Sequence, residues 1–71
     1  LTEFRVSNSS PLCGKELATC NLPSSTLFAL AFRKDEIIAP SGNTILQPGD
    51  TVVAIVTPEV EKELEPLFPE K

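Results

Sequence analysis

The chain has 71 residues, of which 41% are hydrophobic and 23% are charged, and its net charge is −4 at neutral pH. This balance is typical of a small globular domain and excludes an intrinsically disordered chain. The acidic excess and the lack of basic clusters argue against a DNA- or RNA-binding module, which needs positive charge against the phosphates. No stretch approaches about 18 consecutive apolar residues, so we expect no transmembrane helix within these residues.

The chain contains no Met, even at position 1, and a strand-like pattern starts at once. We therefore expect residues 1–71 to be a single domain that belongs to a larger protein. A domain of this length buries only about 60% of the surface that its unfolded chain exposes, so its core is thin. Contact with a second copy or with a neighbouring domain would help to stabilise it.

The first six residues alternate between two kinds of side chain. Thr2, Phe4 and Val6 are separated by charged residues, which predicts a strand with one face in water. A polar loop follows over residues 7–10, and its serines can cap the next element.

The segment from Leu12 to Cys20 has the spacing of a short helix. Cys13, Leu17 and Cys20 lie at positions i, i+4 and i+7, which predicts one apolar stripe. Such a helix would hold the two cysteines about 10 Å apart, whereas a disulfide needs Cα atoms closer than about 7 Å. We therefore interpret the cysteines as small apolar residues in a reducing compartment and not as a redox or metal pair.

Residues 26–33 predict a strand that is apolar on both faces, and such a strand must be covered on both sides. In a domain with few helices, the second cover can be another copy of the protein. Lys34 and Asp35 then form a two-residue hairpin turn, in which Asp is expected to tolerate a positive φ. A short strand follows over residues 36–39. By simple alternation, one face of the strand over residues 26–33 carries Leu27, Ala29 and Ala31, and the other carries Phe28, Leu30 and Phe32.

The central segment predicts a rigid connection between two strands. Pro40 ends the first strand, because proline has no backbone donor. Turn signals follow from Ser41 to Asp50, and Pro48-Gly49 has the sequence of a type II turn. Two apolar residues between these turns, Ile45 and Leu46, are expected to be held against the core.

A strand over residues 51–56 and a helix complete the pattern. Thr57 is the expected N-cap and Pro58 the first helical residue. The apolar stripe of this helix is Val60, Leu64 and Leu67. The sequence therefore predicts an α+β fold: a small two-layer β-α-β-β-β-α domain, with a mixed, mostly antiparallel sheet and helices packed on it.

The residues carry no recognisable catalytic chemistry. The chain has no His, and no Ser lies in a Gly-x-Ser-x-Gly motif. With two Cys and no His, a zinc site would need added carboxylates, so we expect no metal site. The three glycines are isolated, so no phosphate-binding loop and no cofactor are predicted. We expect a protein that is not an enzyme, in which Asp50 is a turn residue that accepts local backbone hydrogen bonds.

Arg33 allows two interpretations. It can be a surface residue paired with Glu36 across the hairpin, which would contribute little to stability. It can also lie at the rim of an apolar cleft and bind a phosphate or carboxylate. The spacing of residues leaves both open.

Three stretches of the chain resemble a known family. The run from Glu36 to Val53 (EIIAPSGNTILQPGDTVV) resembles the signature of the TrkA C-terminal domain, also called the RCK-C domain of regulators of potassium conductance. The run from Ser10 to Leu17 (SPLCGKEL) is similar to the start of that family's first helix, and Thr57-Pro58-Glu59 matches its strand-to-helix junction. The resemblance covers nearly the whole chain.

This resemblance implies a regulatory, ligand-sensing α/β domain that forms homodimers in the cytoplasm. Such domains belong to potassium transport and channel proteins, and to other transporters. They bind a small ligand in a cleft at the dimer interface, and in some members it is the nucleotide cyclic di-AMP. A purely structural dimerisation module without a ligand is the alternative.

The family motif also implies which residues contact the ligand. Arg33 would meet a phosphate, and Ile38 and Pro40 would offer apolar walls to a base. The full set of candidate ligand-binding residues is Ala31, Phe32, Arg33, Ile38, Pro40 and Asn43.

Overall fold

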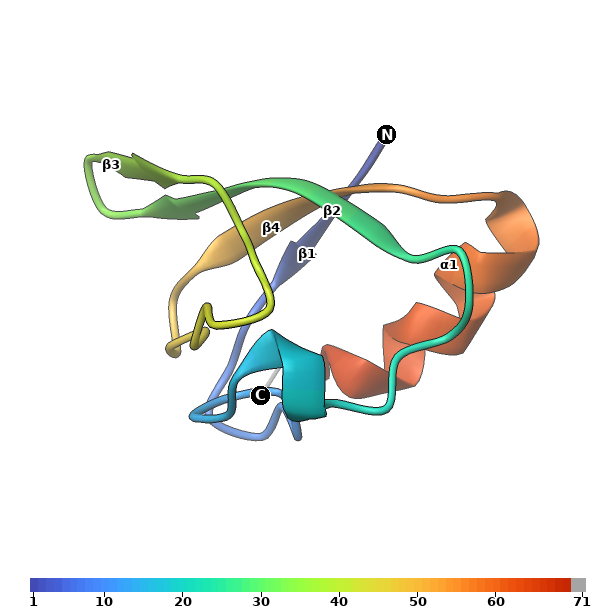
Figure 1. The fold of residues 1–71 in the computed structure, drawn as a ribbon, viewed down its shortest axis with the longest axis horizontal. Coiled ribbons are helices and arrows are strands. Elements are labelled where there is room, and N and C mark those ends of the chain that lie inside the picture. The colour runs from blue at the N-terminus through green and yellow to red at the C-terminus, as the bar shows by residue number, and fades with distance from the viewer. Residues whose placement is uncertain (70–71) are drawn as a thin grey trace.

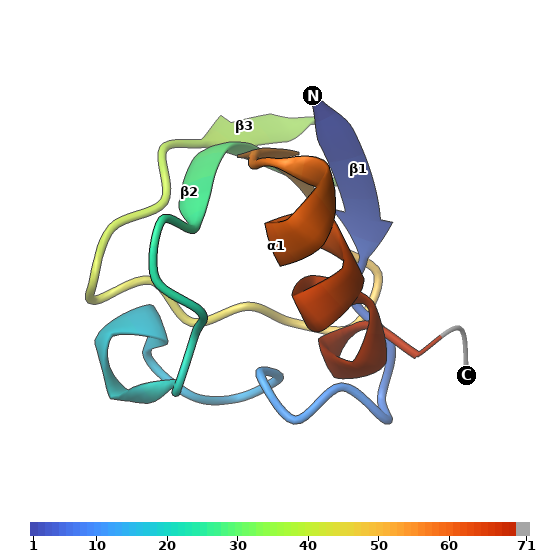
Figure 2. The same cartoon turned by 90° about the vertical axis from the view of Figure 1, so that its right-hand side faces the viewer.

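A computed structural model describes residues 1–69 and shows a four-stranded sheet with the helix and loops of these residues packed against one face (Figures 1 and 2). The strands lie in the order β1-β4-β2-β3, and each neighbouring pair is antiparallel. The α+β class and the two-layer arrangement are confirmed, although the sheet over residues 1–69 is antiparallel throughout and not mixed. The elements in chain order are β1 (Thr2–Arg5), the 3-10 turn η1 (Leu17–Thr19), β2 (Leu27–Arg33), β3 (Glu36–Ile38), β4 (Thr51–Ile55), α1 (Pro58–Leu64) and the 3-10 turn η2 (Glu65–Leu67).

The two strands at one side of the sheet alternate as expected. Phe4 of β1 lies opposite Val52 of β4, and both side chains are buried on the inner face, which the helix and loops cover. Glu3 lies opposite Val53 on the other face, which we call the outer face. Thr2 is also on the inner face, where its hydroxyl donates a 2.8 Å hydrogen bond to Glu61 of α1.

The predicted faces of β2 are wrong because the strand contains a bulge. Phe28 lies opposite Ala54 and Leu30 lies opposite Val53, so Ala29 is an extra residue in β2. A bulge reverses the alternation beyond it. Consequently Leu27 and Leu30 share the outer face, whereas sequence alternation placed them on opposite faces.

The hairpin after β2 forms where it was predicted. In the backbone register of β2 and β3, Arg33 lies opposite Glu36, and the two residues between them make the turn. The positive φ falls on Lys34, at 56°, and not on Asp35 as expected.

The predicted helix over Leu12–Cys20 is also wrong. The structure has turns followed by the 3-10 turn η1, and Gly14 has a φ of 82°, which is incompatible with a right-handed helix. The backbone amides here bond to a distant segment: Gly14 N–H donates to Leu46 O at 3.0 Å, and Leu17 N–H donates to Thr44 O at 2.9 Å. These long-range bonds replace the i→i−4 bonds of a helix. Cys13 and Cys20 are free thiols that are half-buried against the core.

The connection between β3 and β4 is held against the core by one residue. Leu46 is fully buried, while Ile45 is 45% exposed. Of the two residues that were expected to be held against the core, only Leu46 enters it. The turn that follows is as predicted, since Asp50 N–H donates to Gln47 O at 3.1 Å and Gly49 has a φ of 94°.

The C-terminal helix follows its sequence signals. Thr57 Oγ1 accepts a hydrogen bond from Val60 N–H at 3.3 Å, and α1 begins at Pro58. Beyond α1, Phe68 folds back and stacks on Phe4, with ring centroids 4.7 Å apart. Within residues 1–69, no helix has the length and apolar character needed to cross a bilayer.

We expect Leu46→Ala to lower the free energy of unfolding by about 2–5 kcal/mol, because it removes buried methyl groups and leaves a cavity. The neighbouring Ile45→Ala variant is the matched control and should cost much less, since Ile45 is 45% exposed. Urea denaturation followed by circular dichroism measures both. Equal losses in the two variants would contradict the assignment of Leu46 as the anchor.

Candidate functional site

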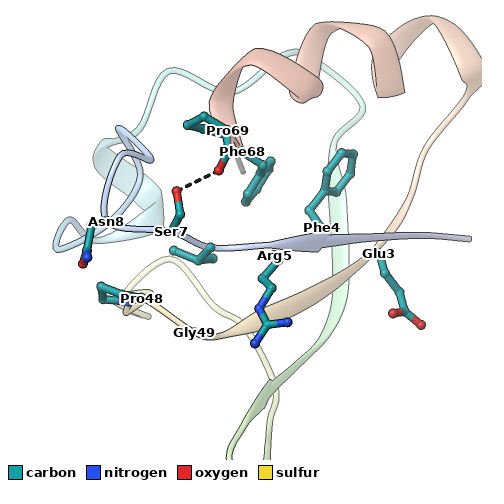
Figure 3. Close-up of a pocket in the computed structure, with 10 residues that line it drawn as sticks. Glu3, Phe4, Arg5, Ser7, Asn8, Pro48, Gly49, Phe68 and Pro69 are labelled. Atoms are coloured by element: carbon teal, nitrogen blue, oxygen red, sulfur yellow. Dashed lines mark hydrogen bonds between the residues drawn. The ribbon is translucent and has the colours of Figure 1, made fainter. Parts of the chain in front are cut away.

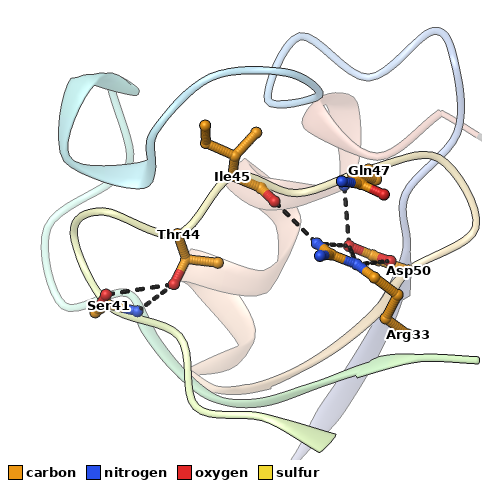
Figure 4. A network of polar contacts seen from close by, with 6 residues as sticks. All are labelled: Arg33, Ser41, Thr44, Ile45, Gln47 and Asp50. Atoms are coloured by element: carbon orange, nitrogen blue, oxygen red, sulfur yellow. Dashed lines mark hydrogen bonds and ion pairs between the residues drawn. The ribbon is translucent and has the colours of Figure 1, made fainter. Parts of the chain in front are cut away.

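An ion pair between the half-buried Arg33 and the buried Asp50 joins the end of β2 to the start of β4 (Figure 4). The pairing of Phe32 with Thr51 places Arg33 beside Asp50. Arg33 Nη2 donates to Asp50 Oδ2 at 2.8 Å, and Nε donates to Oδ1 at 3.0 Å. This is the two-pronged geometry that suits a guanidinium and a carboxylate. Arg33 is therefore held in one orientation.

The same pair fixes the connection between β3 and β4. Arg33 Nη2 also donates to Ile45 O at 2.9 Å, and Gln47 N–H donates to Asp50 Oδ2 at 2.9 Å. The second bond confirms that Asp50 accepts a local backbone hydrogen bond. The side chain of Asp50 is almost fully buried, so these bonds satisfy a carboxylate that has little access to water.

The ion pair shifts the pKa values of both residues. Burial alone raises the pKa of Asp50, but the hydrogen bonds from Arg33 and Gln47 outweigh burial and leave the pKa below its usual value. The hydrogen bonds to Asp50 raise the pKa of Arg33, against a smaller opposing effect of desolvation. Both groups are therefore charged at neutral pH.

Of the two interpretations of Arg33, the surface pair with Glu36 is wrong, because the guanidinium bonds to Asp50. The role in binding an anion stays a prediction. Arg33 lines a hollow of about 310 Å³ together with Lys34 and Gln47. Sequence reasoning did not pair Arg33 with Asp50, although an Arg that ends one apolar strand and an Asp that begins another could have suggested it.

The other predicted ligand-binding residues do not line one cavity within residues 1–69. Ala31 is fully buried and lies opposite the half-buried Ile38. Phe32 is on the outer face, opposite Ile37. Pro40 lines a separate apolar hollow of about 220 Å³.

Asn43 is exposed in the loop after β3. The six predicted residues are therefore not brought together into one site within residues 1–69.

On the outer face of the sheet, β2, β3 and β4 carry a band of apolar side chains that no other residue of 1–69 covers, whereas β1 carries the charged Glu3 and Arg5 there. Ile37 is 68% exposed and Ile55 is 48% exposed, and their neighbours across the face are also apolar. Sequence reasoning placed an uncovered apolar face on β2 but missed the contribution of β4. The apolar residues of the outer face are Leu27, Leu30, Phe32, Ile37, Val53 and Ile55.

A groove of about 800 Å³ lies beside β1 (Figure 3). One wall is formed by residues 3–8, from β1 and the loop that follows it, and Phe68 and Pro69 form another. Ser7 Oγ donates to Pro69 O at 2.7 Å and so ties the two walls together. None of the residues that line this groove is among the six ligand-binding residues predicted from the sequence.

A family model described as the TrkA-C domain matches residues 1–68. The whole chain is 34% identical to the "Trk system potassium uptake protein trkA homolog 1" of Methanosarcina mazei and covers 18% of that protein. Over 68 residues, or 96% of this chain, it is 26% identical to the "Trk system potassium uptake protein TrkA homolog 2" of the same organism and covers 15% of it. The chain thus corresponds to a small part of each relative.

The fold is similar to that of a solved structure described as "Structure of RCK domain with cda". The TM-score is 0.84 at 24% sequence identity, and the match covers 96% of both chains. At this identity the likeness shows a shared fold.

We expect Asp50→Asn to lower the free energy of unfolding at neutral pH by about 1.5–3 kcal/mol, the usual contribution of a hydrogen bond to a charged group. The folded-state pKa of Asp50 is lower than its unfolded value of about 3.9. The stabilisation is therefore complete above the unfolded pKa and is lost as the pH falls through the folded pKa. Melting temperatures of wild type and variant between pH 7 and pH 2 should converge toward the acid end. A constant difference over this range would contradict an ionised Asp50 in the folded state.

Proposed function

Because the chain belongs to the TrkA-C domain family, we propose that it is a regulatory domain that senses a small ligand and forms a homodimer in a potassium transport protein. The names of the two Methanosarcina mazei relatives support potassium uptake as the process. The rest of the transport protein is the implied partner, and the domain acts on its cytoplasmic side. The domain itself performs no catalysis in this proposal.

The observation that carries the proposal is the outer face of the sheet. A surface of contiguous apolar side chains on a small domain marks a site of protein contact. Its most exposed member, Ile37, lies on β3, and Ile55 lies at the end of β4, so the apolar surface extends across three strands. A second copy offers an equally apolar surface, and a two-fold axis would bury both.

The ligand is proposed to bind where two copies meet. Arg33 offers a charged group, Asn43 an exposed amide, and Ile38 and Pro40 apolar surface, a combination that suits a nucleotide such as cyclic di-AMP. The solved RCK domain described "with cda" supports a small ligand for this fold. Ala31 is buried and would support this site from behind. Phe32 would contribute from the outer face. Binding that favours one arrangement of the two copies would then bias the attached transporter.

The alternative is a structural dimerisation module without a ligand. The same outer face favours it, because this face requires a partner but no nucleotide. The two functions differ in whether any small molecule stabilises the dimer.

We expect Ile55→Glu to remove association through the outer face and so lower the mass of the assembly, because it places a charge within an apolar contact. Ile45→Glu is the matched control: its side chain has nearly the same exposure, 45% against 48%, but lies away from the outer face. Sedimentation equilibrium measures the mass of each. Dimers of unchanged stability in Ile55→Glu would exclude the outer face as the contact.

We expect one nucleotide of a panel that includes cyclic di-AMP to raise the melting temperature of the dimer. A ligand at 100 times its dissociation constant stabilises the folded state by about 2.7 kcal/mol, which corresponds to a rise in melting temperature of roughly 10–20 °C for a domain of this size. Asn43→Ala should abolish the shift, and Asn8→Ala, another exposed asparagine, should retain it. A dimer with no shift from any nucleotide would favour the structural module.

A further inference from the structure

The free edge of β1 is a second surface that needs an explanation. β1 is an outermost strand of the sheet and pairs only with β4 among the described residues. The groove of about 800 Å³ runs along this edge (Figure 3). β1 is short and carries two charged residues, Glu3 and Arg5, so any partner of this edge must match their charges.

The hydrogen bonds of Val6 show which backbone groups face the free edge. Val6 N–H donates to Asp50 O at 2.8 Å, and Val6 O accepts from Gly49 N–H at 2.8 Å. Both groups of Val6 therefore point toward β4. In an antiparallel pair the bonding direction alternates along the strand, so Glu3 and Arg5 direct their N–H and C=O groups toward the free edge.

We propose that β1 pairs antiparallel with β1 of a second copy of this chain, with the two-fold axis at Phe4. In this register Glu3 lies opposite Arg5 of the second copy, and Arg5 lies opposite its Glu3. The residues whose backbone groups face the free edge thus pair with each other, and each acid meets a base on the same face of the joined sheet. The two four-stranded sheets become one.

Other two-fold registers are less favourable because of charge. An axis at Glu3 places two glutamates opposite each other, and an axis at Arg5 places two arginines opposite each other. Like charges directly opposite destabilise a strand pair. The axis at Phe4 also brings two Phe4 rings together, each already stacked on Phe68. Charge complementarity therefore selects a second copy in one register as the occupant of this edge.

This contact is separate from the outer-face contact proposed above and does not depend on it. Glu3 and Arg5 are exposed, so changes at these positions leave the core intact. The test uses single charge reversals, Glu3→Arg and Arg5→Glu, in both the wild-type and the Ile55→Glu background. In the second background, association through the outer face is removed.

We expect each single reversal to weaken edge association about tenfold or more, because both cross-strand pairs become like-charged. An equimolar mixture of Glu3→Arg and Arg5→Glu should recover association, because each variant then presents the charges that the other lacks. The double reversal should also recover it. Sedimentation velocity measures association, and thermal melting followed by circular dichroism checks that each variant folds.

Two results would overturn the proposal. One is a monomeric Ile55→Glu protein at concentrations at which the wild type forms oligomers, since no edge association would then exist. The other is equal association of both single variants and their mixture. In either case the outer-face contact is judged separately, by the comparison of Ile55→Glu with Ile45→Glu.

Discussion

The buried carboxylate of Asp50 is the constraint on which the rest of the domain depends. Its side chain accepts hydrogen bonds from Arg33 at the end of β2 and from the backbone N–H of Gln47 in the preceding turn. Its backbone carbonyl accepts a hydrogen bond from the N–H of Val6, the residue that follows β1. One residue thus connects three strands and a turn, and because a buried charge without partners is costly, these elements must keep their relative positions. The loop after β3 is fixed by the same pair through Ile45 O.

Features set by a few consecutive residues could be predicted from the sequence. Pro48-Gly49 formed the expected turn, Thr57 capped α1, and the alternation in β1 placed Phe4 inside. In each case the physical cause is local: a restricted φ, a side chain that reaches a nearby amide, or the period of a strand. The family resemblance added the fold class, which local signals alone leave incomplete.

Features set by contacts between distant segments could not be predicted. The amides of Gly14 and Leu17 bond to the loop before β4, so an apolar stripe with helical spacing did not become a helix. The bulge at Ala29 depends on the register between β2 and β4, and it reversed the faces assigned by alternation. The partner of Arg33 was missed for the same reason. Asp50 lies 17 residues away in sequence and becomes its neighbour only when the strands pair.

The division of residues between the two faces of the sheet bears directly on function. Arg33 and Phe32 are consecutive in β2, so their side chains point to opposite faces, and Arg33 is already oriented by Asp50. A ligand that used both residues of one copy would have to pass around the sheet. In the proposed outer-face dimer, Phe32 would be buried between the copies while Arg33 would stay on the opposite face, so the two residues would contact different molecules. A ligand that bound only one arrangement of the copies would still make binding and assembly depend on each other, which is how a ligand can regulate an assembly.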